Sequence, residues 1–144
     1  MIRITSEPFD AGDELRAFLE VAGEGAVASF VGIVRGDGVD ALTLDHYPGF
    51  TEKQVAALVD RLIERHRLAA ALLVHRFGTM EPGETIMFAA TAAPHRRAAL
   101  DALDELIGQL KTDAPFWKKE RRGEAEHWLE PPQATTAAPQ QSCA

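Results

Sequence analysis

The stretch from Leu110 to Glu120 combines cationic and aromatic side chains in a pattern that could bind and transform an anion. It reads L-K-T-D-A-P-F-W-K-K-E, and five of the chain's fifteen lysine and arginine residues fall between Lys111 and Arg122. The whole chain carries a formal net charge of -7. A local cationic cluster on an acidic protein indicates a specific anionic ligand more than general attraction to polyanions. The alternative is a solvated, charged loop after a helix, which is what most charge runs are.

Lys111 and Lys118 are the residues whose chemistry this arrangement could alter. A lysine that lies near other cations, or is partly desolvated, holds its proton less tightly and becomes usable as an acid, a base or a nucleophile. Phe116 and Trp117 could bury one side of the turn between them. These residues predict a cationic pocket for a phosphorylated or carboxylated substrate, with lysine chemistry.

His95 and Arg96 open a helix directly after a strand, where free backbone N–H groups favour an anion. The helix dipole disfavours cations at this end, so their presence is a mild indication of function. The alternative is that Arg96 and Arg97 pair with Asp101 or Glu105 further along the same helix.

Other catalytic chemistries find no support in the sequence. The five histidines form no H-E-x-x-H motif or close cluster with carboxylates, so we expect no metal site. There is no G-x-S-x-G motif and no phosphate-binding P-loop. The single cysteine, Cys143, lies in a low-complexity stretch and is a poor candidate for a nucleophile.

Length and composition favour one globular domain in a reducing cytoplasm. The chain has 144 residues, 46% of them hydrophobic and 26% charged, which is ordinary for a folded domain. No apolar run approaches the roughly 20 residues that span a bilayer. The negative charge argues against general binding of nucleic acid or membrane. We expect a domain over residues 1–130 and a disordered tail over 131–144.

The order of elements predicts an α+β fold with three helices and a largely antiparallel or mixed sheet. Asp10 is the expected N-cap of the first helix, and Thr51 with Gln54 resembles a capping box for the second. The third helix should begin near Pro94 and end at Pro115. We expect strands at 2–5, 26–34, 41–47, 70–77, 85–92, 116–120 and 127–130. The 26–34 strand, followed by Arg35, reads as buried on both faces and as the first arm of a hairpin with 41–47, and its Gly32 suggests a bulge.

Six segments resemble the large, catalytic subunit family of molybdopterin synthase, in the family's order. The string L-K-T-D-A-P-F-W-K-K-E is the most specific of them. The segments are G-A-V-A-S-F-V-G-I-V-R (25–35), L-T-L-D-H-Y-P-G-F-T-E (42–52), H-R-F-G-T-M-E-P-G-E (75–84), A-P-H-R-R-A-A-L-D-A (93–102), L-K-T-D-A-P-F-W-K-K-E (110–120) and G-E-A-E-H-W-L-E (123–130).

This resemblance implies an α/β hammerhead fold and a sulfurtransferase of molybdenum cofactor biosynthesis. The family forms a central homodimer with a small ubiquitin-like sulfur-carrier subunit at each end, a heterotetramer. The carrier's C-terminal Gly-Gly tail enters a pocket of the large subunit, where its thiocarboxylate donates sulfur. The substrate is cyclic pyranopterin monophosphate, and two sulfur transfers yield the dithiolene of molybdopterin. The step needs no metal and no organic cofactor.

The resemblance also implies roles for residues that match the family's motifs. Arg35, with Ile33 and Val34, would line the substrate pocket. His95 and Arg96 match a pair that binds the pterin or its phosphate.

Two lysines match the family's essential ones. Lys111 would lie near the carrier's terminal carbonyl, and Lys118 is the second, with Lys119 and Glu120 adjoining it. Cations in a water-poor pocket would stabilise both the oxyanion of acyl transfer and the charge exposed when the cyclic phosphate opens.

A few positions depart from the family's pattern. The turn at 36–40 is short, Asp45 stands where Glu is common, and Phe50 stands where Met is common. The alternative function is a non-catalytic α+β module that binds an anion or RNA through Lys111–Arg122.

Overall fold

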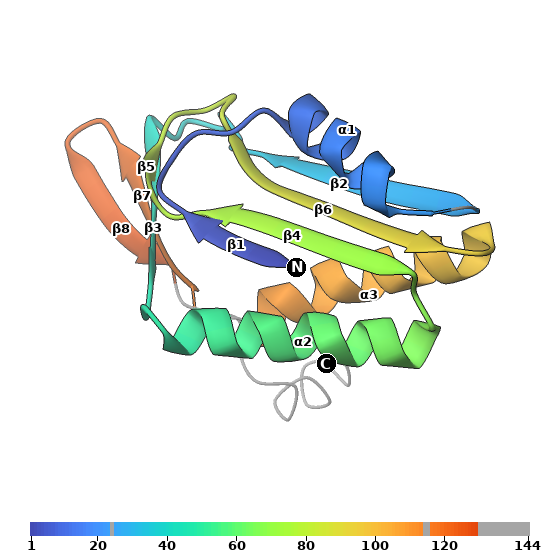
Figure 1. Cartoon of the computed structure of the whole chain (residues 1–144). Helices are drawn as coiled ribbons and strands as arrows, with labels where there is room; N and C mark the ends of the chain where they lie inside the picture. Colours follow the sequence, from blue (N-terminus) through green and yellow to red (C-terminus); the bar gives the residue numbers. More distant parts are fainter. Residues whose placement is uncertain (24, 114–115, 130–144) are drawn as a thin grey trace, which may run out of the picture.

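The computed structural model describes residues 1–23, 25–113 and 116–129, which form three helices and eight strands (Figure 1). The helices are α1 (Ala11–Val21), α2 (Phe50–His66) and α3 (Arg96–Asp113). The strands are β1 (Ile2–Thr5), β2 (Ala26–Ile33), β3 (Ala41–His46), β4 (Ala70–Arg76), β5 (Gly78–Met80), β6 (Thr85–Ala93), β7 (Phe116–Arg122) and β8 (Ala125–Leu129).

The strands divide between two four-stranded sheets. The first has the order β1-β4-β6-β2, in which only the β1–β4 pair is parallel. The second has the order β5-β3-β7-β8 and is antiparallel throughout. The predicted α+β class, with three helices and largely antiparallel strands, is confirmed.

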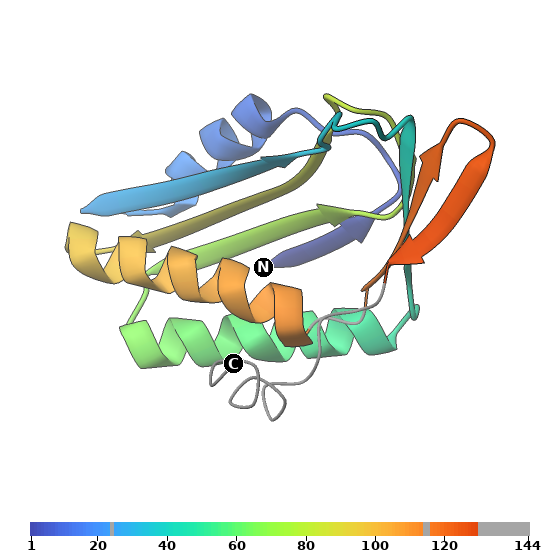
Figure 2. The same ribbon diagram turned by 180° about the vertical axis from the view of Figure 1, so that it is seen from behind.

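Helices cover both faces of the first sheet, and the second sheet stands at one end of the molecule (Figures 1 and 2). Helices α2 and α3 lie side by side on one face and α1 lies on the other. Successive side chains of β4 point to opposite faces of the sheet. Leu73 packs into the core beneath α2 and α3, and Val74 packs into the core beneath α1. The second sheet lies at one end of the layer that α2 and α3 form.

Strand β2 differs from its prediction in two respects. Among the described strands it pairs only with β6, while β3 belongs to the other sheet, so the predicted hairpin between β2 and β3 is wrong. It is also not buried on both faces, because β2 is an edge strand and Val27, Phe30 and Val31 are exposed. The predicted irregularity at Gly32 is confirmed: the register shifts there, and a Cβ would lie 2.8 Å from Met87 Cγ.

Helix α2 begins earlier than its predicted capping box. Its N-cap is Gly49, whose backbone N–H donates to Glu52 Oε2 at 2.8 Å. Thr51 is buried inside the first turn and accepts a hydrogen bond from the Tyr47 amide instead. The predicted cap of α1 is confirmed, since Asp10 accepts from the Asp13 amide at 2.9 Å.

Several predictions concern residues outside the described ranges. They are the end of α3 at Pro115, the domain boundary at 130, the tail at 131–144 and Cys143. Within the ranges that are described, none of the helices combines the length and the apolar character needed to cross a membrane.

Candidate active site

Strand β7 presents a charged face to a cavity where the two sheets and α3 meet. Because side chains alternate along a strand, its cavity-facing residues are spaced by two. They are Phe116, Lys118, Glu120 and Arg122. Trp117 has the opposite parity and packs edge-on against Tyr47, with ring centroids 4.6 Å apart. The sequence suggested that Phe116 and Trp117 bury the same side of the chain. In the structure the two aromatics lie on opposite faces of β7.

The cavity has a volume of about 520 Å³ and gathers most of the predicted site residues. Its lining combines apolar side chains of β2, β6 and α3 with cationic groups from three separate segments. The predicted residues in it are Ile33, Val34, Arg35, Lys111, Lys118 and Glu120. Among the residues that the structure describes, Arg35, Lys111 and Lys118 form no ion pair. Their charges remain available to a ligand.

Arg35 is positioned by a backbone bridge that follows β2. The Val34 amide donates to Glu84 O, and the Gly83 amide donates to Val34 O, both at 2.9 Å. The turn that carries Glu84 is itself held, because Glu84 accepts from the Glu81 amide at 2.6 Å and from Arg76 at 3.0 Å. The Glu81 amide, followed by Arg76, holds the pKa of the Glu84 carboxyl below its usual value.

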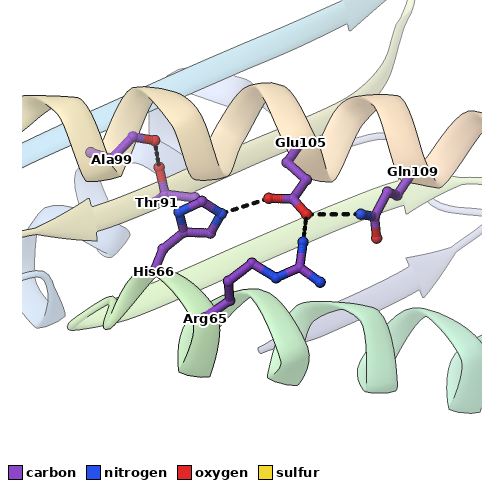
Figure 3. Close-up of polar contacts among 6 residues, drawn as sticks. All are labelled: Arg65, His66, Thr91, Ala99, Glu105 and Gln109. Carbon is purple, nitrogen blue, oxygen red and sulfur yellow. Dashed lines mark hydrogen bonds and ion pairs between the residues drawn. The ribbon is translucent and has the colours of Figure 1, made fainter.

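Lys111 lies in the last turn of α3, where the negative end of the helix dipole favours a cation. Helix α3 is fastened to α2 by Glu105, as Figure 3 shows. Glu105 pairs with Arg65 and binds His66 at 2.6 Å and Gln109 at 2.9 Å. These contacts fix the helix that carries Lys111.

A buried hydroxyl ties the same helix to the first sheet. Thr91 on β6 donates to Ala99 O on α3 at 2.7 Å (Figure 3).

Arg96 and Arg97 form no ion pair with any described residue. Glu105 pairs instead with Arg65 and His66 of α2. The alternative in which Asp101 or Glu105 neutralises them along the helix is therefore absent from the structure.

Lys118 has the electrostatic environment that the sequence predicted. Burial is the first cause of its lowered pKa, the charge of Lys111 is the second and that of Arg35 adds to it, while Glu120 opposes them. The side chain still reaches solvent at the mouth of the cavity. A lysine in this setting gives up its proton more readily than a free lysine.

His75 is a cavity residue for which the sequence predicted no role. It lies near the end of β4, is 8% exposed and stacks on Phe116 with ring centroids 4.2 Å apart. Burial lowers its pKa to about 4, so it is neutral at pH 7. One feature of the sequence could have indicated a role for His75. It is a polar residue that follows an apolar run and opens the segment H-R-F-G-T-M-E-P-G-E. Arg122 also lines the cavity, although the sequence predicted it only as part of the cationic cluster.

Three predicted residues lie elsewhere. His95 and Arg96 line a separate hollow with Gly25 and Ala26. The helix rise puts them about 24 Å from Lys111. Lys119 is on the other face of β7, 3.3 Å from Glu126 and over the Trp128 ring.

The residues that line the cavity have no grouping typical of a metal site. Across the described ranges, no three His, Cys, Asp or Glu side chains gather as metal ligands would. The cavity offers instead fixed cations, a neutral imidazole and apolar walls. Such a site suits stabilisation of developing negative charge together with proton transfer.

Comparisons with known proteins agree on one family. Residues 4–113 match the model of the family described as MoaE protein. The chain is 42% identical over 134 residues to the molybdopterin synthase catalytic subunit of Caulobacter vibrioides, covering 91% of this chain and 89% of that protein.

Solved structures show the same fold. The molybdopterin biosynthesis MoaE protein from Burkholderia ambifaria superposes with a TM-score of 0.81 at 36% identity, covering 100% of this chain and 98% of that one. A protein–protein complex of subunits 1 and 2 of molybdopterin-converting factor from Helicobacter pylori contains a chain with a TM-score of 0.79. Coverage there is 92% of both chains, and at 22% identity this likeness shows the fold alone.

Proposed function

The chain belongs to the MoaE protein family, and from this premise we propose that it is the catalytic subunit of molybdopterin synthase. The enzyme is a sulfurtransferase of molybdenum cofactor biosynthesis. Its sulfur donor is the thiocarboxylated C-terminus of a small ubiquitin-like carrier, and its acceptor is cyclic pyranopterin monophosphate. The observation that carries the proposal is the cavity, in which Arg35, Lys111 and Lys118 converge from three segments without an ion-pair partner in the described part of the chain.

Each cation has a role that its position supports. Arg35 has the planar, permanently charged head group that suits a phosphate. Lys111 supplies a fixed positive charge for the oxyanion that develops when the carrier's acyl carbon is attacked. Lys118 is suited to proton transfer, because its pKa is lowered by burial and then by Lys111. Proton transfer therefore fits Lys118 better than Lys111.

The carrier's tail fits the shape of the cavity. A C-terminal Gly-Gly segment has no side chains, so it can pass along walls formed by Phe30, Ile107 and Leu110. The terminal thiocarboxylate is an anion and would be attracted to Lys111 and Lys118. The Helicobacter pylori structure is a complex of two subunits of molybdopterin-converting factor, which is consistent with such a partner for this chain. The enzyme would act in the cytoplasm.

A homodimer would complete the site. His95 and Arg96 are too far from Lys111 to touch one small substrate within a single chain. Strand β2 runs from the His95 hollow, at Ala26, to the lysine cavity, at Ile33. It is an exposed, apolar edge strand, which is a ready surface for pairing.

Antiparallel pairing of two β2 edges about a twofold axis would explain both hollows. It places the Ala26 end of one strand beside the Ile33 end of its partner. The His95–Arg96 pair of one protomer then approaches the lysine cavity of the other. The substrate's phosphate and pterin would be held from both chains.

The test of the function is a reconstitution. The purified chain is incubated with a thiocarboxylated carrier and cyclic pyranopterin monophosphate, and the products are analysed by mass spectrometry. The proposal predicts a dithiolene product that has gained two sulfur atoms. Absence of product with a carrier that is active with another family member would favour the non-catalytic binding module.

A further inference from the structure

His75 lines the cavity, and one of its ring nitrogens has no hydrogen-bond partner in the described structure. The residue lies in the cavity wall with Lys118. It follows a run of apolar residues in β4, where an apolar side chain such as leucine would be expected. A buried polar group destabilises a fold unless its hydrogen bonds are made. Its two nitrogens therefore need separate explanations.

Nδ1 is satisfied within the fold. It lies 2.9 Å from Arg76 O, and a carbonyl oxygen only accepts, so Nδ1 carries the ring proton. The stack on Phe116, with an angle of 17° between the rings, fixes the plane of the imidazole. Burial keeps the ring neutral at pH 7 by lowering its pKa.

Nε2 is consequently an unprotonated acceptor in a fixed orientation. It makes no hydrogen bond to any residue that the structure describes. The cavity otherwise offers mainly donors, from Arg35, Lys111 and Lys118. Its carboxylates are Asp37 and Glu120, and Glu120 is already bonded to the Arg122 guanidinium at 3.2 Å.

We propose that His75 is a ligand-recognition residue, whose Nε2 accepts a hydrogen bond from an N–H group of the molecule that occupies the cavity. The proposal rests on the proposed function, which brings two such molecules to the site. The substrate carries N–H groups on its pterin rings, and the carrier's tail carries peptide N–H groups. Once the bound molecule covers this acceptor, an analogue that lacks the matching donor is penalised, because the acceptor is then left unpaired.

Three substitutions separate the two ring nitrogens. His75→Gln places an amide oxygen near the position of Nε2. His75→Asn keeps a polar group near Nδ1 and removes Nε2. His75→Phe keeps a ring that can stack on Phe116 and removes both nitrogens.

Two binding measurements identify which molecule donates. The first is the Kd of cyclic pyranopterin monophosphate, and the second is the Kd of the carrier with an ordinary C-terminal carboxylate. We expect His75→Asn and His75→Phe to weaken one of the two by about tenfold, the worth of one hydrogen bond. His75→Gln should stay within about threefold of the unsubstituted chain, as a partial replacement of that bond would.

The proposal is overturned if all three variants bind both molecules as the unsubstituted chain does. It is also overturned if His75→Gln loses as much affinity as His75→Phe, since the ring shape would then be what matters. Thermal melting identifies the variants that fold, and the comparison of Gln with Phe is sufficient if Asn does not. Product formation by the unsubstituted chain tests the proposed function separately, so the two can fail independently.

Discussion

Lys118 owes its lowered pKa to its burial and to charges that can be removed one at a time. After burial, the Lys111 ammonium is the largest cause, and the Glu120 carboxylate acts in the opposite direction. Like charges disfavour the protonated amine, and an opposite charge favours it. The two neighbours should therefore shift the pKa in opposite directions when they are neutralised.

We expect Lys111→Met to raise the pKa of Lys118 and Glu120→Gln to lower it further. Both substitutions conserve size and remove one charge. NMR titration of the lysine side chains measures the pKa directly, with the Lys118 signal assigned by its loss in Lys118→Arg. Lys53→Met, which removes an exposed lysine at the start of α2, is the control and should leave the titration unchanged. If both cavity substitutions also left it unchanged, the coupling between these charges would be disproved.

The residues around Lys118 could be predicted from the sequence because they are local. Lys111, Phe116 and Lys118 lie within eight positions, and a charge cluster beside an aromatic is visible in any reading of the chain. His75 could not be found in this way, since only the pairing of β3 with β7 brings Phe116 near the end of β4. Arg122 was not predicted as a pocket residue because the predicted strand ended at Glu120, whereas β7 extends to Arg122.

At the scale of elements, the Arg76–Glu84 contact supports the strand end that carries Arg35. Glu84 receives both a backbone N–H and the Arg76 guanidinium, and its carbonyl holds Val34. Glu84→Gln removes the charge and one acceptor while it keeps the size. We expect a lower kcat/KM, by up to about 100-fold if the strand end moves by about 1 Å. Steady-state kinetics with varied cyclic pyranopterin monophosphate measures the effect.

Asp10→Ala is the matched control for that substitution. It removes the N-cap of α1, on the opposite side of the first sheet from α2 and α3. Loss of such a cap destabilises a protein by about 1 kcal/mol, and kcat/KM should be unchanged at a temperature where the chain is folded. An equal loss of kcat/KM in both variants would show that the Glu84 effect is only general instability.

Local patterns predicted the elements well and their partners poorly. Asp10 and the apolar spacing of the helices are local signals, and they placed α1, α2 and α3 correctly to within a few residues. The pairing of β2 depends on residues some sixty positions away, in β6. Its apolar composition therefore predicts burial, although the described chain leaves this edge open. The predicted capping box paired Thr51 with Gln54, so Glu52 was not predicted as a cap partner. The N-cap is instead Gly49, with φ 86°, and Glu52 lies three residues after it.

At the scale of the whole molecule, the predicted site is divided between the two ends of α3. Lys111 and Arg96 are separated by nearly the full length of that helix. If the site forms between protomers, variants at the two ends should complement each other. Arg96→Ala and Lys111→Ala should each be nearly inactive alone.

Dimers that contain one chain of each variant should regain activity. One of their two sites would then combine two substituted residues, and the other would combine Lys111 and Arg96 in their unsubstituted form. Random mixing would restore about a quarter of the unsubstituted activity, since half of the dimers are mixed and half of their sites are intact. The measurement is product formation after the two variants are unfolded and refolded together. Activity no higher than that of either variant alone would place the site within one chain.

The assembly is the part that the sequence could suggest only through the family resemblance. His95 and Arg96 were identified by their position at a helix start, and the structure confirms that α3 begins there. Nothing in their local sequence states which lysine cavity they would serve. In the proposed dimer the answer depends on the exposed edge of β2, which becomes visible only when the strand order is known.

Single-turnover sulfur transfer by Lys111→Ala tests the central claim most directly. The reaction contains thiocarboxylated carrier and cyclic pyranopterin monophosphate, with the dithiolene product followed by mass and the affinity for the carrier measured in parallel. The account predicts product from the unsubstituted chain and none from Lys111→Ala, with the carrier affinity retained within about threefold, because one exposed cation adds little to a whole interface. Product formation by Lys111→Ala at the normal rate would contradict it.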